Sequence, residues 1–137
     1  MEGLVLVDAA NVIGSVPDGW WRDRRGAAER LRDRLAALVQ GHQGGLPQGP
    51  GVPGWAARGP LELVLVVEGA ARGVASVEGV RVESASGSGD DHIVELAAGR
   101  APGRPCLVVT ADRGLRARVA ALGAGVVGPR AVRGRAG

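Results

Sequence analysis

Four short apolar runs stand out along the chain, and none of them alternates with polar residues. They are rich in Val and Leu and cover residues 4–7, 63–67, 107–109 and 125–127. Unbroken runs of this kind are typical of strands that are buried on both faces of a parallel sheet. A weaker run, residues 80–83, alternates between apolar and polar positions, which favours a strand near a sheet edge. The pattern therefore predicts a mostly parallel central sheet.

Three further stretches have apolar residues at helical spacing. They span residues 27–38, 91–98 and 115–122, and Gly123 is well placed to end the last of them. Strands that alternate with helices imply βαβ units with right-handed crossovers. We therefore predict a single α/β domain over residues 1–137, with helices on both faces of the sheet.

Two segments fall outside this pattern. Residues 41–60 are rich in Gly and Pro, a composition that does not hold regular structure for long. Such long loops are uncommon inside compact domains, so we expect a flexible insertion or a functional flap, in which Trp55 stacks on a base or holds the loop in place. Residues 130–137 are expected to form a frayed tail.

Composition and charge add constraints on partner and location. A net charge of +3 and a pI near 10.8 favour a polyanionic partner such as nucleic acid. The sequence has no Lys, Phe or Tyr, so a GC-rich coding bias accounts for part of its arginine content. The lone Cys106 fits a reducing cytoplasm. No apolar stretch approaches the roughly 18 residues of a membrane helix, and no leader precedes the first strand. We expect a cytoplasmic protein with no membrane partner.

Acidic residues stand where the predicted strands end. Asp8 and Glu68 follow the first two long runs, Asp112 follows the third, and the pair Asp90 and Asp91 stands at the start of the second helix. In an open α/β sheet the carboxyl ends of parallel strands meet at one edge, where ligands bind. We therefore expect these five carboxylates to share one crevice.

Carboxylates that share a crevice repel each other, so either their pKa values rise or a cation neutralises them. Hard oxygen ligands select Mg²⁺ or Mn²⁺, and a single Cys and two distant His residues offer no competing site. A carboxylate-held metal suits phosphodiester hydrolysis, with one or two ions. His92, beside the acid pair, is either a proton relay or part of an exposed helical turn.

Several of these acids also have a purely structural interpretation. Ser88 and Asp91 fit a capping box at the start of a helix. Asp112 fits a residue that complements a helix dipole, and Glu68 fits a solvated acid at a strand end. Asp8 has no obvious packing or capping role, which makes it the acid with the strongest claim to function. The joint placement of the acids is more informative than any one of them.

Three segments resemble a known family. LVLVDAANVIG, residues 4–14, resembles the opening of NYN domains, and GSGDDHIVE, residues 87–95, resembles the Asp-Asp-x-Ile-x-Glu segment of their YacP-like branch. VVTADRGLRAR, residues 108–118, resembles the strand of that family that ends in Thr-x-Asp-Arg. The resemblance implies a PIN-like three-layer sandwich and a metal-dependent ribonuclease. It also implies RNA as partner, with the ribosome or another RNA-processing component as a further candidate.

The resemblance also implies roles for individual residues. Asn11 would orient Asp8 or the attacking water, and Thr110 would contact a ligand acid or the substrate. Two departures from the family pattern are Glu68, where Asp is common, and Ala9-Ala10, where Gly-Tyr is common. By position, the residues around Mg²⁺ or Mn²⁺ would be Asp8, Asp90, Asp91 and Asp112, with Glu68 as a further metal ligand.

Aromatic and basic side chains complete the predicted substrate site. Asp18 is expected to cap a helix that begins near Trp20 and Trp21. Adjacent Trp residues on a helix cannot both face inward, so one of the two, with Trp20 as the predicted contact, is expected to stack on a base. Arg22 and Arg113 are expected to grip phosphates; the alternative for each is a solvated helix face.

The sequence therefore favours a metal-dependent ribonuclease. The alternative is a non-catalytic RNA-binding or partner-docking module on the same fold. A phosphatase with Asp8 as nucleophile is disfavoured, because Ala10 stands where such enzymes carry a second acid and the chain has no Lys. A dinucleotide-binding protein is disfavoured because no Gly-rich turn follows the first strand.

Overall fold

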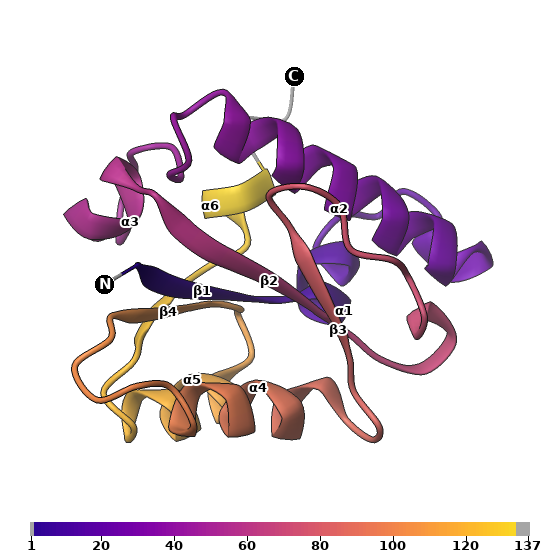
Figure 1. Cartoon of the computed structure of the whole chain (residues 1–137). Helices are drawn as coiled ribbons and strands as arrows, with labels where there is room; N and C mark the ends of the chain where they lie inside the picture. The colour runs from indigo at the N-terminus through magenta and orange to yellow at the C-terminus, as the bar shows by residue number, and fades with distance from the viewer. Residues whose placement is uncertain (1, 134–137) are drawn as a thin grey trace.

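A parallel sheet of five strands forms the centre of the molecule in a computed structural model, which describes residues 2–133 (Figure 1). Every neighbouring pair of strands is parallel, so the predicted α/β class with a parallel central sheet is confirmed. The predicted strand at residues 80–83 is also confirmed as an edge strand. In spatial order the strands are β3 (Arg81–Ser84), β2 (Leu61–Val67), β1 (Gly3–Asp8), β4 (Cys106–Val109) and β5 (Gly125–Val127).

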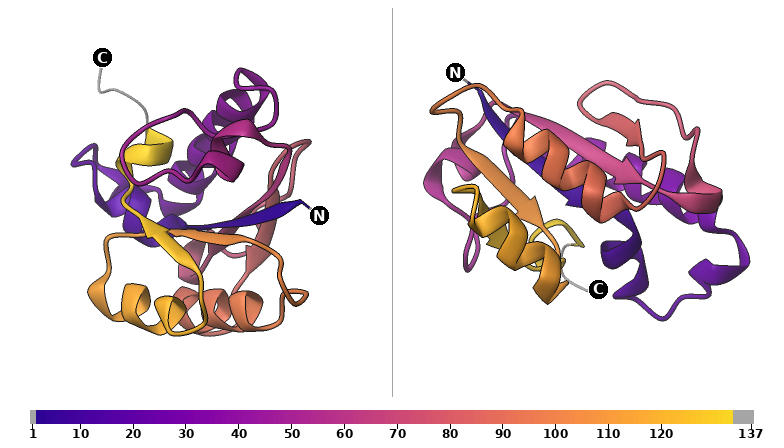
Figure 2. Two further views of the ribbon diagram at one scale, coloured as in Figure 1. Left: turned by 90° about the vertical axis from the view of Figure 1, so that its left-hand side faces the viewer. Right: turned by 90° about the horizontal axis from the view of Figure 1, so that it is seen from below.

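Helices cover both faces of the sheet and give three layers (Figures 1 and 2). No helix within residues 2–133 combines the length and the apolar character needed to cross a membrane. One face carries α1 (Ala9–Gly14), α2 (Arg24–Gln40), α3 (Gly54–Arg58) and α6 (Arg130–Arg133), and the other carries α4 (Gly89–Ala98) and α5 (Arg113–Ala120).

Two apolar cores lie on opposite faces of the sheet, because successive side chains of a strand point to opposite sides. Odd-numbered residues of β1 and β2, such as Val5, pack against α2 through Leu31 and Leu35. Even-numbered residues, such as Leu6, pack against α4 through Ile93. A residue that continues the even series beyond the end of β1 or β2 therefore lies on the α4 side of the sheet.

The start of the long helix differs from the sequence prediction. Asp18 was expected to cap it, but α2 begins at Arg24 and its cap is Asp23, which accepts a 2.9 Å hydrogen bond from the Gly26 amide. Residues Trp20–Arg22 form a separate turn of 3₁₀ helix that begins after Gly19, whose φ is 81°. A left-handed residue interrupts a helix, so a continuous helix cannot run from Asp18.

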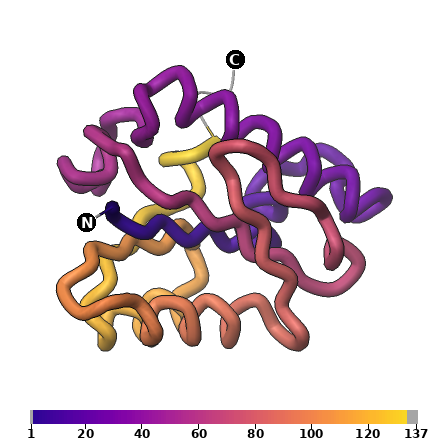
Figure 3. The backbone as a smooth tube through the Cα atoms, in the orientation of Figure 1, coloured from indigo at the N-terminus to yellow at the C-terminus, as the bar shows by residue number. Residues whose placement is uncertain are grey.

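Residues 41–60 are more regular than the open loop expected from their composition. Five of these residues form α3, and Leu46 and Ala56 are buried in the core on the α2 face. Trp55 lies against Gly3, where an added Cβ would overlap its indole, so it holds the segment to the start of β1. Figure 3 traces the segment to the end of the sheet where the chain begins.

The predicted frayed tail is helical over its first four residues. Arg130–Arg133 form α6, and Val132 is buried in the core on the α2 face. The rest of the predicted tail, residues 134–137, lies outside the described residues.

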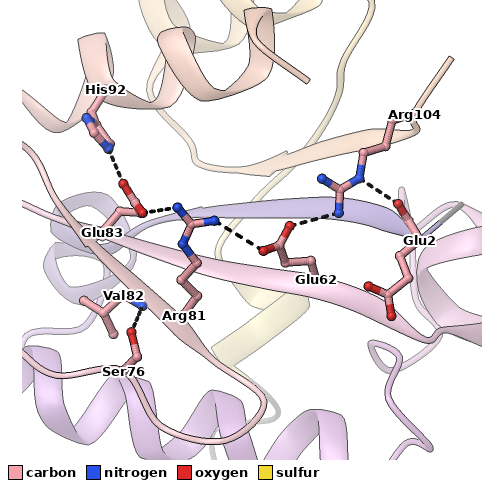
Figure 4. Close-up of polar contacts among 8 residues, drawn as sticks. All are labelled: Glu2, Glu62, Ser76, Arg81, Val82, Glu83, His92 and Arg104. Atoms are coloured by element: carbon pink, nitrogen blue, oxygen red, sulfur yellow. Dashed lines mark hydrogen bonds and ion pairs between the residues drawn. The ribbon is translucent and has the colours of Figure 1, made fainter. Parts of the chain in front are cut away.

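A chain of ion pairs runs along the α4 side of the β3 edge (Figure 4). His92 Nε2 lies 2.9 Å from a Glu83 oxygen, and Glu83 pairs with Arg81. Arg81 also contacts Glu62 at 3.4 Å, and Glu62 pairs with Arg104 at 2.9 Å. The hydrogen bond from His92 and the charge of Arg81 lower the pKa of Glu83. The His92 side chain therefore connects α4 to the edge strand.

Candidate functional site

The strand order reverses direction at β1. The chain adds β2 and β3 on one side of β1 and then crosses over to add β4 and β5 on the other. Ligands of open α/β sheets bind at the carboxyl ends of the strands beside such a switch point. Asp8 ends β1 and Thr110 follows β4, and the preceding residues Val7 and Val109 are paired across the two strands. The first and third motifs of the sequence therefore meet at the switch point.

Asp8 is almost completely buried, with 4% of its surface exposed. Its Oδ2 accepts a 2.9 Å hydrogen bond from the Thr110 hydroxyl, and its Oδ1 accepts a 3.4 Å hydrogen bond from the Asn11 amide. The second bond makes Asp8 the N-cap of α1. Asp8 therefore has the capping role that the sequence did not reveal, in addition to its position at the switch point.

Thr110 connects Asp8 to the loop that carries Asp112. Its fully buried hydroxyl donates to Asp8 and accepts a 3.1 Å hydrogen bond from the Asp112 amide. Asn11 makes a second connection, because its side-chain oxygen accepts a 2.8 Å hydrogen bond from the Ala111 amide. Thr110 therefore positions Asp8 and Asp112 by hydrogen bonds, and Asn11 holds the loop of residues 110–112 against α1.

Replacing Thr110 with Val is expected to lower the free energy of unfolding by about 2 kcal/mol, because it leaves the Asp8 oxygen and the Asp112 amide without their partner. Urea denaturation at pH 7.5 in EDTA would measure the loss. Thr110→Ser is the control, because it keeps the hydroxyl and is expected to lose less. Equal stability of the two variants would contradict the assigned role of the hydroxyl.

Two more acids lie close to Asp8 on the α4 side of the sheet. Glu68 continues the even-numbered series of β2, and its carboxylate lies against the start of α4: a Cβ added at Gly89 would be 2.9 Å from Glu68 Oε1. Burial raises the pKa of Asp8 to about 6, and repulsion from Asp90 and Glu68 adds to the rise. The hydrogen bonds from Thr110 and Asn11 act in the opposite direction.

Asp90 extends this group to Asp112. Burial raises the pKa of Asp90, and the charges of Asp112 and Glu68 raise it further. No ion pair within residues 2–133 neutralises any of these four acids. The acidic group, defined as Asp8, Glu68, Asp90 and Asp112, is therefore a concentration of negative charge that forms no ion pair in the described part of the chain, and the nearby charge of Arg118 offsets the rise in the pKa of Asp90 only in part.

Asp91 lies at the margin of this group. Its carboxylate is exposed and pairs with Arg118 of α5 at 3.0 Å, and its amide donates to Ser88, the cap of α4. The helix-cap interpretation also holds for Asp112, whose Oδ1 accepts a 2.8 Å hydrogen bond from the Leu115 amide. Among the predicted metal ligands, Glu68 therefore raises the pKa of Asp8 by its charge, whereas Asp91 pairs with Arg118.

The acidic group has the oxygen chemistry that Mg²⁺ or Mn²⁺ requires. Within residues 2–133, however, no three acidic, His or Cys side chains lie close enough together to form a ready-made metal site. Asp8 and Asp112 both direct carboxylate oxygens to helix caps. The donor set therefore fits a hard divalent cation in its chemistry, while its carboxylates are not gathered around a single point.

The predicted substrate residues differ in how accessible they are. Arg113 is exposed at the start of α5. Arg116 instead donates a 2.9 Å hydrogen bond to the Thr110 carbonyl, a contact that no local pattern predicts. Trp20 is half-buried, and Trp21 is the exposed member of the pair at 53%. The Arg22 guanidinium lies over the Trp21 ring, 5.9 Å from its centroid.

The fold is similar to that of a known protein. It matches the crystal structure of a mutant of Rae1 (YacP) from Bacillus subtilis with a TM-score of 0.69, and the match covers 96% of this chain and 72% of that one. The two sequences are 18% identical, so the likeness establishes a YacP-like fold. The sequence matches no protein-family model. It also matches no curated protein.

Proposed function

We propose that this chain is a metal-dependent ribonuclease of the NYN type, in the YacP-like branch of the PIN-like superfamily. The observation that carries the proposal is the buried Asp8 at the switch point, whose charge is opposed by Glu68 and Asp90 and is balanced by no ion pair in residues 2–133. A bound cation relieves such repulsion. The YacP-like fold and the three motifs in their order support the same conclusion.

The acidic group would hold Mg²⁺ or Mn²⁺, with Asp91 available at its margin. When bound, such an ion lowers the pKa of water and balances charge on phosphoryl oxygens. The chain's own residues supply the positioning: Thr110 fixes the Asp8 carboxylate, and Asn11 fixes the loop before Asp112. Arg113, which is exposed at the start of α5, would bind a phosphate of RNA.

An RNA substrate is consistent with the net charge of +3. A cytoplasmic location, and the ribosome or another RNA-processing component as partner, belong to the same proposal. The observation that favours a second function is the lack of a ready-made metal site in residues 2–133. That function is an RNA-binding or partner-docking module that does not cut RNA.

The proposal predicts that the purified chain shortens 5′-labelled RNA in Mn²⁺ or Mg²⁺ and that EDTA stops the reaction. We expect a metal requirement because, in residues 2–133, no basic side chain forms an ion pair with the acidic group and so takes the place of the ion. Gel electrophoresis of the products would measure it. RNA binding that weakens with salt, with no cleavage in either metal, would replace the nuclease with the binding module.

A further inference from the structure

A pocket of about 310 Å³ lies between α1, the turn after it and α2. Its location relates it to the acidic group, because α1 begins directly after Asp8 and Val12 of α1 lines the pocket. Val12 stands four positions after Asp8, which corresponds to a rise of about 6 Å along a helix. A ligand in the pocket would therefore lie about one helical turn from the candidate site.

The floor of the pocket is apolar, and its walls carry charge. Ile13 and Val16 provide partly exposed aliphatic surface above the buried Val12, and Arg30 and Arg34 provide two guanidinium groups. Arg30 and Arg34 are four residues apart on α2, so they lie on the same helix face. One acid, Asp18, also lines the pocket, so its net charge is positive.

Four of the arginines of α2 divide into two sets. Arg25 donates to the carbonyl oxygens of Arg72 and Gly73, and Arg32 donates to that of Ala75, so these two hold a loop of the fold. Arg30 and Arg34 make no hydrogen bond or ion pair within residues 2–133. The arginines that face the pocket are therefore available to a ligand with negative charge.

We infer that this pocket binds one unpaired nucleotide of an RNA strand, an inference that rests on the proposed function and names a subsite beside it. The base lies on Ile13 and Val16, and phosphate oxygens accept hydrogen bonds from Arg30 and Arg34. The volume is at the lower end of the range for small-ligand pockets, roughly 300–1,000 Å³, which suits one nucleotide. Asp18 accepts from an amino group of the base.

The lining favours a nucleotide over an acidic peptide. A peptide carboxylate would find two guanidinium groups but would leave the aliphatic surface and the Asp18 acceptor without matching groups. A nucleotide joins a flat base to a phosphate and so uses both parts of the pocket. A base that is paired in a duplex is already covered by its partner strand and cannot enter.

The test is fluorescence anisotropy with a labelled eight-nucleotide single-stranded RNA, in EDTA so that the RNA is not cut. Arg34→Gln is expected to weaken binding by about tenfold, because it removes a charged hydrogen-bond donor, and to reduce the slope of log K against log salt by about 0.7. Arg30→Gln should behave alike. The matched control is Arg58→Gln on α3, which removes one exposed charge away from the pocket and should change Kd by less than about twofold.

The outcomes separate the subsite from the proposed function. Equal effects of Arg34→Gln and Arg58→Gln would overturn the subsite, as would equal affinity for the same RNA in a duplex or tighter binding of a polyglutamate probe. Cleavage by the wild-type protein in Mn²⁺ is scored in a separate assay. If cleavage is absent while Arg34→Gln weakens binding selectively, the subsite stands and the nuclease proposal fails.

Discussion

Asp8→Asn is expected to lower the rate of RNA cleavage by on the order of a hundredfold or more, the size of effect seen when a key charge-stabilising group is removed from an active site. The amide has no charge to attract a divalent cation. The fold should survive, because Asn is as good an N-cap as Asp and its oxygen can still accept a hydrogen bond. Single-turnover cleavage of labelled RNA in Mn²⁺ would measure the change.

The matched control is Asp33→Asn, the same chemical change at an exposed acid of α2. Asp33 pairs with Arg32 on the surface and belongs to neither the acidic group nor the pocket. Its cleavage rate should stay within about twofold of the wild-type rate, since a surface pair of this kind contributes little. An Asp8→Asn variant that cuts RNA as fast as this control would remove Asp8 from the reaction.

The same substitution is expected to stabilise the metal-free protein. At pH 8 in EDTA, Asp8→Asn should raise the free energy of unfolding by about 2–3 kcal/mol, since each pKa unit corresponds to about 1.4 kcal/mol. The wild-type protein must keep a buried carboxylate charged, although burial raises the pKa of Asp8 to about 6. The amide is neutral and avoids this cost. A less stable variant at pH 8 would contradict the expectation.

The pH dependence of this stabilisation by Asp8→Asn follows from the direction in which the pKa of Asp8 shifts. Because the pKa of Asp8 is about 6 in the folded state and 3.8 as its ordinary value, protonation favours the folded wild-type protein below pH 6. The advantage of Asp8→Asn should therefore be full above about pH 7, decrease between pH 6 and 4, and vanish below about pH 3.8. Urea denaturation at pH 4 and pH 8 would show it, and an advantage that does not change with pH would contradict it.

Much of the fold could be predicted from local patterns. Runs such as residues 63–67 predict buried strands because a parallel sheet hides both faces of a strand. The short helix α1 was missed, since six residues carry too little periodicity to be recognised. Its cap, Asp8, was missed with it. The start of α2 was misplaced, because Asp18 and Asp23 look alike as caps and only the left-handed Gly19 separates them.

The location of the candidate site could be predicted, but not which of the acids lie nearest to Asp8. That Asp8 and Thr110 lie together follows from strands that end in polar residues, given a parallel sheet. The nearness of Glu68 depends on β2 lying next to β1, and strand order leaves no local signal in a sequence. Asp91 pairs with Arg118 because α4 packs beside α5, which is a property of tertiary structure.

The ion-pair chain on β3 has a consequence for self-association. A chain with several unbroken Val and Leu runs is at risk of intermolecular β-pairing, and the outermost strand of a sheet is where such pairing begins. Here that strand has only four residues, and Arg81 and Glu83 are committed to a network that includes Glu62 and His92. A short edge strand that carries charged side chains disfavours the pairing of a strand from another molecule, so we expect this edge to contribute little to aggregation.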